Sequence, residues 1–170
     1  RGSITGNIVG NTFQHCTAEG HGGGIRVDGS MTSANFSNNI FSNCQSSRFG
    51  GGIHVDGSMT SPNFSNNRFE NCHGQYGGGV SVGNQIDADT FSNNRFENCT
   101  AENNGGGVSV GDVMSSANFS NNIFSNCQSS QSGGGMYVGG SISSANINDN
   151  TFTTDYGAYY GGGGMDVGDL

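Results

Sequence analysis

Apolar residues recur along this chain at a fixed interval of 27 or 28 residues. Most repeats read as a Phe or Ile, two small polar residues and an Asn, then a second Phe, a Cys, a Gly triplet and an aliphatic residue two positions before a Val. The second aromatic position is held by Phe13, Phe41, Phe69, Phe96, Phe124 and Phe152. A repeat of this length indicates stacked supersecondary units that bury their apolar faces against one another.

Within one repeat, the alternation of apolar and polar residues predicts short strands. In Ile25–Val27 the two aliphatic side chains face one side and the central Arg faces the other, which is the period of a β-strand. Further apolar positions follow at Met31, Phe36 and Phe41. We therefore expect about three short strands per repeat, joined by bends in the Asn-rich and Gly-rich stretches.

Three other repeat architectures fit the sequence less well. Leucine-rich repeats share the period, but Leu170 is the only Leu, and collagen needs abundant Pro, whereas Pro62 is the only Pro. Helical repeats need helix-forming residues at helical spacing, and these segments are rich in Ser, Asn, Gly, Thr and Val. The sequence therefore predicts an all-β, right-handed parallel β-helix of about six coils, the hand being taken from the rule for parallel crossovers.

Residues 1–170 are predicted to form a single β-helix domain. The first residues align with the interior of a later repeat, and the last residues, Gly162–Val167, break off partway through another. Neither end has the polar capping unit that repeat arrays normally carry. We therefore expect a segment of a longer chain or an uncapped unit that stacks on its own kind.

Repeated Asn and Cys positions are predicted to form rows along the coil axis. Stacked in register, four Asn are expected to hydrogen-bond to one another as an internal ladder, namely Asn39, Asn67, Asn94 and Asn122. The five Cys form one inward row and are interpreted as small buried filler. Their predicted spacing also allows disulfides, but five is an odd number, so the oxidation state stays open.

The low charge and the absence of Lys limit the classes of partner. The chain has 170 residues, of which 31% are hydrophobic and 11% charged, and a net charge of −8. A chain this acidic lacks the basic surface that nucleic acid or an anionic membrane requires. No apolar run is long enough to span a bilayer, so no membrane insertion by this segment is expected.

Signals for catalysis are weak. Gly20-His21-Gly22 superficially resembles a Gly-His-Gly element of polygalacturonases, but the paired Asp and the Arg-x-Lys partner of those enzymes are missing. Paired carboxylates for glycoside hydrolysis are not evident, and a linear Cys row does not converge into a tetrahedral metal site. We therefore expect no enzyme activity, no metal and no cofactor.

Charged residues also stack in register. Arg26 and His54 share an outward row, each two residues before an Asp; solvated ion pairs are the default interpretation, with a cation site or a sugar contact as the alternative. Arg68 and Arg95 lie one coil apart. A diagonal contact from Arg68 to Glu97 is expected to offset this stacking of like charges.

The segment between each Cys position and the following Gly triplet varies most between repeats, and it holds a one-residue deletion and a one-residue insertion. We call this segment the variable ridge. Loops that vary in this way often carry binding, so the ridge is the first candidate for recognition. Its candidate residues are His21, Arg48, Phe49, Tyr76, Asn104, Tyr159 and Tyr160.

Two further surface features follow from the repeat. N-glycosylation sequons occur at Asn35, Asn63, Asn98 and Asn118, although such triplets also arise automatically from the repeated Asn-Phe-Ser. An outward Ser row at residues 37, 65, 92 and 120 and a partial Thr/Ser row at 32, 60, 115 and 143 predict a flat, uncharged face. Ice-binding solenoids present such faces, but Asp87 interrupts the second row.

The repeat resembles that of chlamydial polymorphic outer-membrane proteins and related autotransporter passengers. Phe36-Ser37-Asn38-Asn39 and its counterparts match the Phe-x-x-Asn motif of that family, and Gly23-Gly24-Ile25 matches its Gly-Gly-aliphatic motif, with Gly where the family usually has Ala. The resemblance covers essentially the whole chain. It implies a secreted or surface-displayed right-handed β-helix with an adhesive or structural role and no catalysis.

We therefore predict a non-enzymatic structural or adhesive β-helical rod, extracellular or on the cell surface, that can stack end to end into a fibre. Its expected partners are itself, by axial association, or a host or cell-surface protein or glycan, and not nucleic acid. The alternative is a carbohydrate-binding or carbohydrate-processing β-helix. Ice binding is a third, less favoured function.

Overall fold

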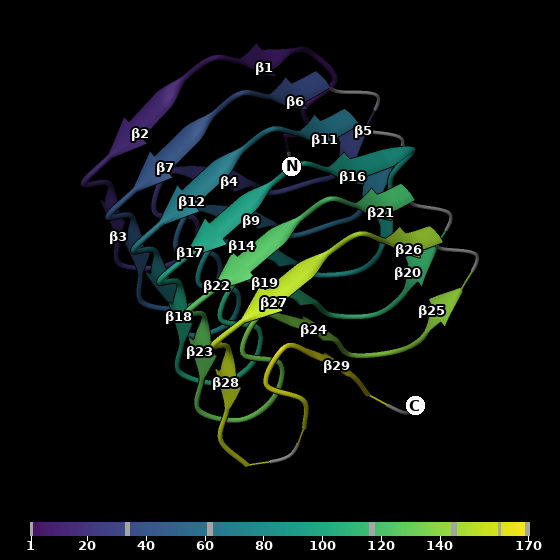
Figure 1. The fold of residues 1–170 in the computed structure, drawn as a ribbon. Helices are drawn as coiled ribbons and strands as arrows, with labels where there is room; N and C mark the ends of the chain where they lie inside the picture. Colours follow the sequence, from purple (N-terminus) through teal and green to yellow (C-terminus); the bar gives the residue numbers. More distant parts are fainter. Residues whose placement is uncertain are drawn as a thin grey trace.

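The computed structural model describes residues 2–32, 35–60, 63–115, 118–143, 146–159 and 161–168. Their regular structure consists of β-strands of two or three residues, which wind into stacked coils from β1, purple in Figure 1, to β29, yellow. Strands at the same place in successive coils pair in parallel, so that five sheets run along the coil axis. The predicted all-β parallel solenoid is confirmed.

Three of the five sheets, B, C and E, contain all of the three-residue strands in the described part of the chain. Sheet B consists of β1 (Ile8–Val9), β6 (Asn35–Ser37), β11 (Asn63–Ser65), β16 (Thr90–Ser92), β21 (Asn118–Ser120) and β26 (Asn146–Asn148). Sheet C consists of β2 (Thr12–Gln14), β7 (Ile40–Ser42), β12 (Arg68–Glu70), β17 (Arg95–Glu97), β22 (Ile123–Ser125) and β27 (Thr151–Thr153). Sheet E consists of β4 (Ile25–Val27), β9 (Ile53–Val55), β14 (Val80–Val82), β19 (Val108–Val110), β24 (Met136–Val138) and β29 (Met165–Val167).

The other two sheets, D and A, contain two-residue strands. Sheet D consists of β3 (Thr17–Ala18), β8 (Gln45–Ser46), β13 (His73–Gly74), β18 (Thr100–Ala101), β23 (Gln128–Ser129) and β28 (Tyr156–Gly157). Sheet A consists of β5 (Met31–Thr32), β10 (Met59–Thr60), β15 (Ile86–Asp87), β20 (Met114–Ser115) and β25 (Ile142–Ser143). A full coil therefore has five strands rather than the three expected. A two-residue strand turns only one side chain inward, so it leaves no alternation to read in the sequence.

Two stacks of Phe rings fill the interior, as the in-register pairing of sheets B and C requires. In sheet C the rings run from Phe13 to Phe152 with centroid separations of 4.6–4.8 Å and interplanar angles of 4–7°. In sheet B the rings run from Phe36 to Phe119 at 4.8–5.1 Å. The strand spacing of about 4.8 Å thus sets the ring spacing. Eight of these side chains are fully buried: Phe36, Phe41, Phe64, Phe69, Phe91, Phe96, Phe119 and Phe124.

The two Asn between sheets B and C have different structural roles. The first, as at Asn66, adopts a left-handed backbone conformation with φ of 56° and turns the chain. The second, as at Asn67, is buried, and its Nδ2 donates to Asn94 Oδ1 at 3.1 Å and to the Phe36 carbonyl at 3.0 Å. The predicted Asn ladder is confirmed, and it extends to Asn11 and Asn150.

The Gly triplets both turn the chain and allow close approach. In five of the Gly runs the first Gly, such as Gly77 with φ of 62°, has a backbone conformation that favours Gly. The third Gly lies against the Phe stack of sheet C, since a Cβ on Gly79 would lie 2.7 Å from Phe96 Cδ1. The backbone that leads into sheet E therefore approaches sheet C closely at this point.

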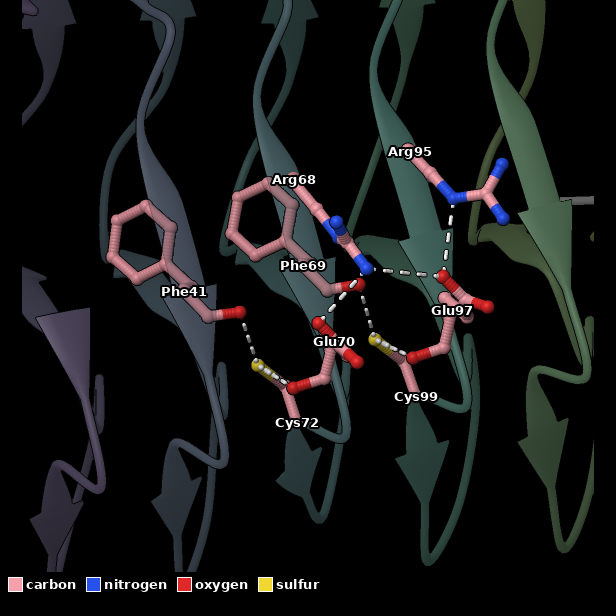
Figure 2. A network of polar contacts seen from close by, with 8 residues as sticks. All are labelled: Phe41, Arg68, Phe69, Glu70, Cys72, Arg95, Glu97 and Cys99. Atoms are coloured by element: carbon pink, nitrogen blue, oxygen red, sulfur yellow. Dashed lines mark hydrogen bonds and ion pairs between the residues drawn. The ribbon is translucent and has the colours of Figure 1, made fainter. Parts of the chain in front are cut away.

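The Cys row is inward, as expected, and all five side chains are free thiols. Cys44, Cys72, Cys99 and Cys127 are fully buried, and Figure 2 shows the thiols of Cys72 and Cys99 donating to the carbonyls of Phe41 and Phe69 at 3.6 Å. In the next coil Asp155 replaces the Cys. Its Oδ1 accepts a hydrogen bond from the Cys127 backbone N–H at 2.7 Å, and burial raises its pKa to about 6.

Candidate functional site

The variable ridge carries a stack of three rings on the outside of the coil. His21 lies on Phe49 with a centroid separation of 5.1 Å, and Phe49 lies on Tyr76 at 5.2 Å. The backbones of Phe49 and Tyr76 pair as an isolated parallel bridge, which holds the two rings in register. The next position along this row is Asn104, so the ring stack ends at Tyr76.

His54 packs against the side of this stack. It occupies the outward position of β9, yet it is only 3% exposed, because the rings of His21 and Phe49 lie 5.0 and 5.2 Å from its own. The default expectation of a solvated ion pair at His54 is therefore wrong. Sequence alternation gave the side on which His54 lies, but the ridge side chains cover that side.

Desolvation lowers the pKa of both imidazoles of this cluster. Desolvation and the neighbouring His21 lower the pKa of His54 to about 4, and desolvation with the charges of Arg26 and Arg48 lowers the pKa of His21. The Nε2 of His54 lies 3.9 Å from Asp56 Oδ1. Arg26 instead pairs with Asp28 at 2.5 Å, with both side chains about half exposed.

A groove lies between the variable ridge and the outer face of sheet E, with a volume of about 410 Å³. Ser81, Ser109 and Tyr137 follow His54 in the outward row of sheet E, each paired in register with the previous one. The groove is hollow because two small Ser lie between two rings. Its lining comprises Phe49, His54, Asp56, Tyr76, Ser81, Val82, Gly83, Asn104, Ser109, Gly111, Tyr137 and Gly139.

The structure brings some of the candidate ridge residues together and separates others. Phe49, Tyr76 and Asn104 line the groove, and His21 supports it through Phe49 and His54. Arg48 is exposed and lies outside the groove lining. Tyr159, 77% exposed, also lies outside it, and Tyr160 lies outside the described residues.

Sequence reasoning singled out His54 and the Asp that follows it, but it missed the rest of the sheet E side of this groove. Tyr137, Ser81 and Ser109 belong to a row that reads Arg, His, Ser, Ser, Tyr, Asp over six coils. Two small residues flanked by two large ones in an outward row are a readable signal for a hollow. That signal gains meaning only once the row is known to lie beside the variable ridge.

Three sequon Asn lie on the outside of sheet B, and the fourth, Asn98, lies in the bend between sheets C and D. Asn63 donates to Asn35 at 3.4 Å, and Asn146 donates to Asn118 at 3.1 Å, so these side chains are bonded along the axis. Asn98 is exposed and has φ of 52°. The sequon Asn side chains thus point outward, as expected for Asn35 and Asn63. Glycosylation stays a prediction.

The Ser row of sheet B does not form the open face expected from the sequence. Ser37, Ser65 and Ser92 are only 6–7% exposed. The following Asn folds over this row: Asn93 Nδ2 donates to Ser92 Oγ at 3.2 Å. An ice-binding lattice needs exposed hydroxyls, so this row does not provide one.

On the outside of sheet C, four charged side chains form a network (Figure 2). Arg68 contacts Glu70 at 3.1 Å and Glu97 at 3.6 Å, and Arg95 contacts Glu97 at 3.1 Å. The hydrogen bond from Arg95 lowers the pKa of Glu97. The predicted diagonal contact is confirmed, and at this exposure it has little energetic value.

Comparison with known proteins identifies the family. A family profile described as a right-handed β-helix region matches residues 2–168. The chain belongs to the right-handed β-helix family. The expected hand of this β-helix is thereby confirmed. No curated protein and no solved structure matches the chain.

No group of three or more His, Cys, Asp and Glu in the described residues is arranged to hold a metal ion. The same residues include no helix that is long and apolar enough to cross a membrane.

Proposed function

We propose that this β-helix is a non-enzymatic structural or adhesive rod, located outside the cell or on its surface. The observation that carries the proposal is the contrast between its interior and its ridge. The Phe, Asn and Cys rows repeat almost unchanged from coil to coil, whereas the variable ridge differs in every coil and presents rings beside a groove. A uniform scaffold with one variable, partly apolar face is typical of recognition by repeat proteins.

The groove supports binding better than hydrolysis. Among the described residues its lining contains one carboxylate, Asp56, whereas glycoside hydrolysis generally uses two carboxyl groups placed on either side of the scissile bond. His54 is buried beneath two rings, so its imidazole is poorly placed to exchange protons with a substrate. The alternative of a carbohydrate-processing β-helix is therefore less favoured than a carbohydrate-binding one.

The motifs shared with chlamydial outer-membrane proteins and autotransporter passengers also support the proposal. In Phe36–Asn39 the Phe enters the core and the last Asn joins the ladder, so the motif encodes the coil itself. An adhesive role on a cell surface is what this resemblance implies for the chain. Self-association along the axis belongs to the same proposal, because another coil of this sequence would continue every backbone and side-chain row.

The test uses the whole 170-residue chain on beads and in solution. We expect the beads to adhere to cells or extracellular matrix, or the chain to form rods or filaments in electron micrographs, without cleavage of any polysaccharide supplied. A bead-bound chain that was scrambled within the variable ridge but kept its coil rows should lose adhesion. Steady release of reducing ends from a polysaccharide would overturn the non-enzymatic role.

A further inference from the structure

The groove between the variable ridge and sheet E points to a specific class of ligand. We propose that it binds a neutral oligosaccharide lying along the coil axis. This inference rests on the proposed function, because it names the chemical class of the adhesive partner. It is carried by the shape of the groove, its rings, its hydroxyl and amide groups, and its charge.

The shape of the groove follows from the outward row of sheet E. His54 and Tyr137 are three strands apart, and the strand spacing makes this distance about 14 Å. Between them Ser81 and Ser109 are almost completely buried and form a low floor. The volume of about 410 Å³ lies within the range of ligand sites, and the elongated form suits a short linear chain.

Aromatic rings flank this floor. Phe49 and Tyr76 lie on the ridge side, and Tyr137 lies at the far end of the sheet E row; all three are partly exposed. In the described part of the chain no ring stacks on the face of Tyr76 that is turned away from Phe49, because Asn104 occupies the next position. A sugar ring has apolar C–H faces and polar edges. Its faces can therefore pack against preorganised, amphipathic Tyr side chains.

The polar groups of the lining suit hydroxyl groups. The Asp56 carboxylate accepts hydrogen bonds, the Asn104 amide both donates and accepts, and the floor adds Ser hydroxyls. Sugars present several adjacent hydroxyls that donate and accept in the same way. The rings would therefore contact the sugar faces while these groups bind its edges.

The charge of the groove argues for a neutral ligand. The described lining includes one acidic residue, Asp56, and no Arg, while the chain as a whole carries −8. Phosphate, sulfate or uronate groups would meet repulsion from Asp56, and no Arg of the described lining offsets it; Arg26, whose charge acts on His54 from the neighbouring coil, pairs with Asp28. The neutral state of His54 adds no positive charge, because its pKa is about 4.

The test measures binding of neutral, uronic and sulfated oligosaccharides and of cationic peptides to the whole chain by glycan array and calorimetry. We expect a neutral oligosaccharide to bind, and Tyr137→Ala to weaken its Kd by at least about tenfold through loss of a ring contact. Ser109→Phe should abolish binding by filling the floor. Tyr156→Ala is the matched control, because Tyr156 is 60% exposed on sheet D and lies outside the groove; it should leave Kd unchanged.

The outcomes separate this inference from the proposed function. Each variant is first checked by circular dichroism for an unchanged β-helix. Wild-type binding to sulfated glycans or cationic peptides alone, or equal Kd values for wild type and Tyr137→Ala, would overturn the groove assignment. Adhesion of beads that survives Tyr137→Ala would leave the adhesive role standing and reject the groove. Glycan binding without adhesion or assembly would support the groove assignment and reject the structural or adhesive role.

Discussion

Replacing Asn67 by Ala removes one rung from the buried Asn ladder. The side chain makes four hydrogen bonds. Its Oδ1 accepts from the backbone N–H of Asn39 at 3.0 Å and from Asn39 Nδ2 at 3.1 Å, and its Nδ2 donates to the Phe36 carbonyl and to Asn94 Oδ1. No other part of Asn67 can replace these bonds, because its own backbone N–H already donates to Asn94 Oδ1 at 3.0 Å.

The expected cost follows from the number of groups left without partners. A buried hydrogen bond contributes about 1 kcal/mol net, so four bonds amount to about 4 kcal/mol. The Asn39 backbone N–H loses its acceptor inside the coil, and such an orphaned group alone costs about 1–3 kcal/mol. We therefore expect Asn67→Ala to lower the free energy of unfolding by about 4 kcal/mol, a large share of the stability of an ordinary domain.

Urea unfolding followed by circular dichroism measures this loss, with Asn63→Ala as the matched control. Asn63 lies in the same coil, is exposed and has a single long bond of 3.4 Å to Asn35, so its replacement should cost less than about 0.5 kcal/mol. Amide hydrogen exchange should show lost protection at Asn39 and retained protection at Asn122. Equal unfolding midpoints for the two variants would show that the ladder contributes no more than a surface amide.

Three further predictions concern packing and pH. Gly79→Ala should lower stability by about 2 kcal/mol or more, because its Cβ would clash with the Phe96 ring and the Gly107 carbonyl, whereas Gly20→Ala, with open space around it, should be neutral in the same urea assay. Between pH 6.5 and 4, His54 is neutral in the folded state and protonated in the unfolded state, so the stability should fall as the pH drops through this range. His54→Ser should remove this dependence of stability on pH. An unchanged dependence would contradict the burial of the ring. Asp155 has the opposite effect: because its pKa is raised to about 6 in the folded state, stability should rise as pH falls from 6 toward 3.8. Asp155→Asn keeps an acceptor for the Cys127 N–H. In thermal unfolding this variant should be more stable than wild type at pH 7.5 and should lack the rise.

The parts of the fold that sequence could predict are those in which a residue meets its own counterpart one repeat away. Phe64 lies between Phe36 and Phe91, and Asn67 bonds to Asn39 and Asn94, because stacking in register turns sequence period directly into contact. The same reasoning placed the Cys row inside. It failed on the number of strands per coil. A two-residue strand such as Thr17–Ala18 is defined by its backbone pairing and shows no alternation of apolar and polar side chains.

The groove lay beyond prediction because it depends on contact between different rows. His21 and His54 touch, yet they belong to the variable ridge and to sheet E and come from adjacent coils. The repeat period does not show which two rows are neighbours around the coil. It also does not show whether a side chain of one row covers the other row. Those facts come from the bend at the Gly triplet, which follows the ridge directly and sets it beside the outward face of sheet E.

Departures from the repeat therefore carry the specificity of this β-helix, and the repeat makes them possible. Five sheets and two ring stacks hold each coil so firmly that an outward residue can change without moving the backbone of its neighbours. A Ser in place of a ring in the outward row of sheet E, as at Ser81 and Ser109, then produces a hollow rather than a collapse. In a domain with a single irregular core, relaxation of the surroundings fills part of the space that such a change leaves. In a stacked coil, the position of the small residues along one row fixes the length of the groove, and the ridge residues beside them fix its chemistry.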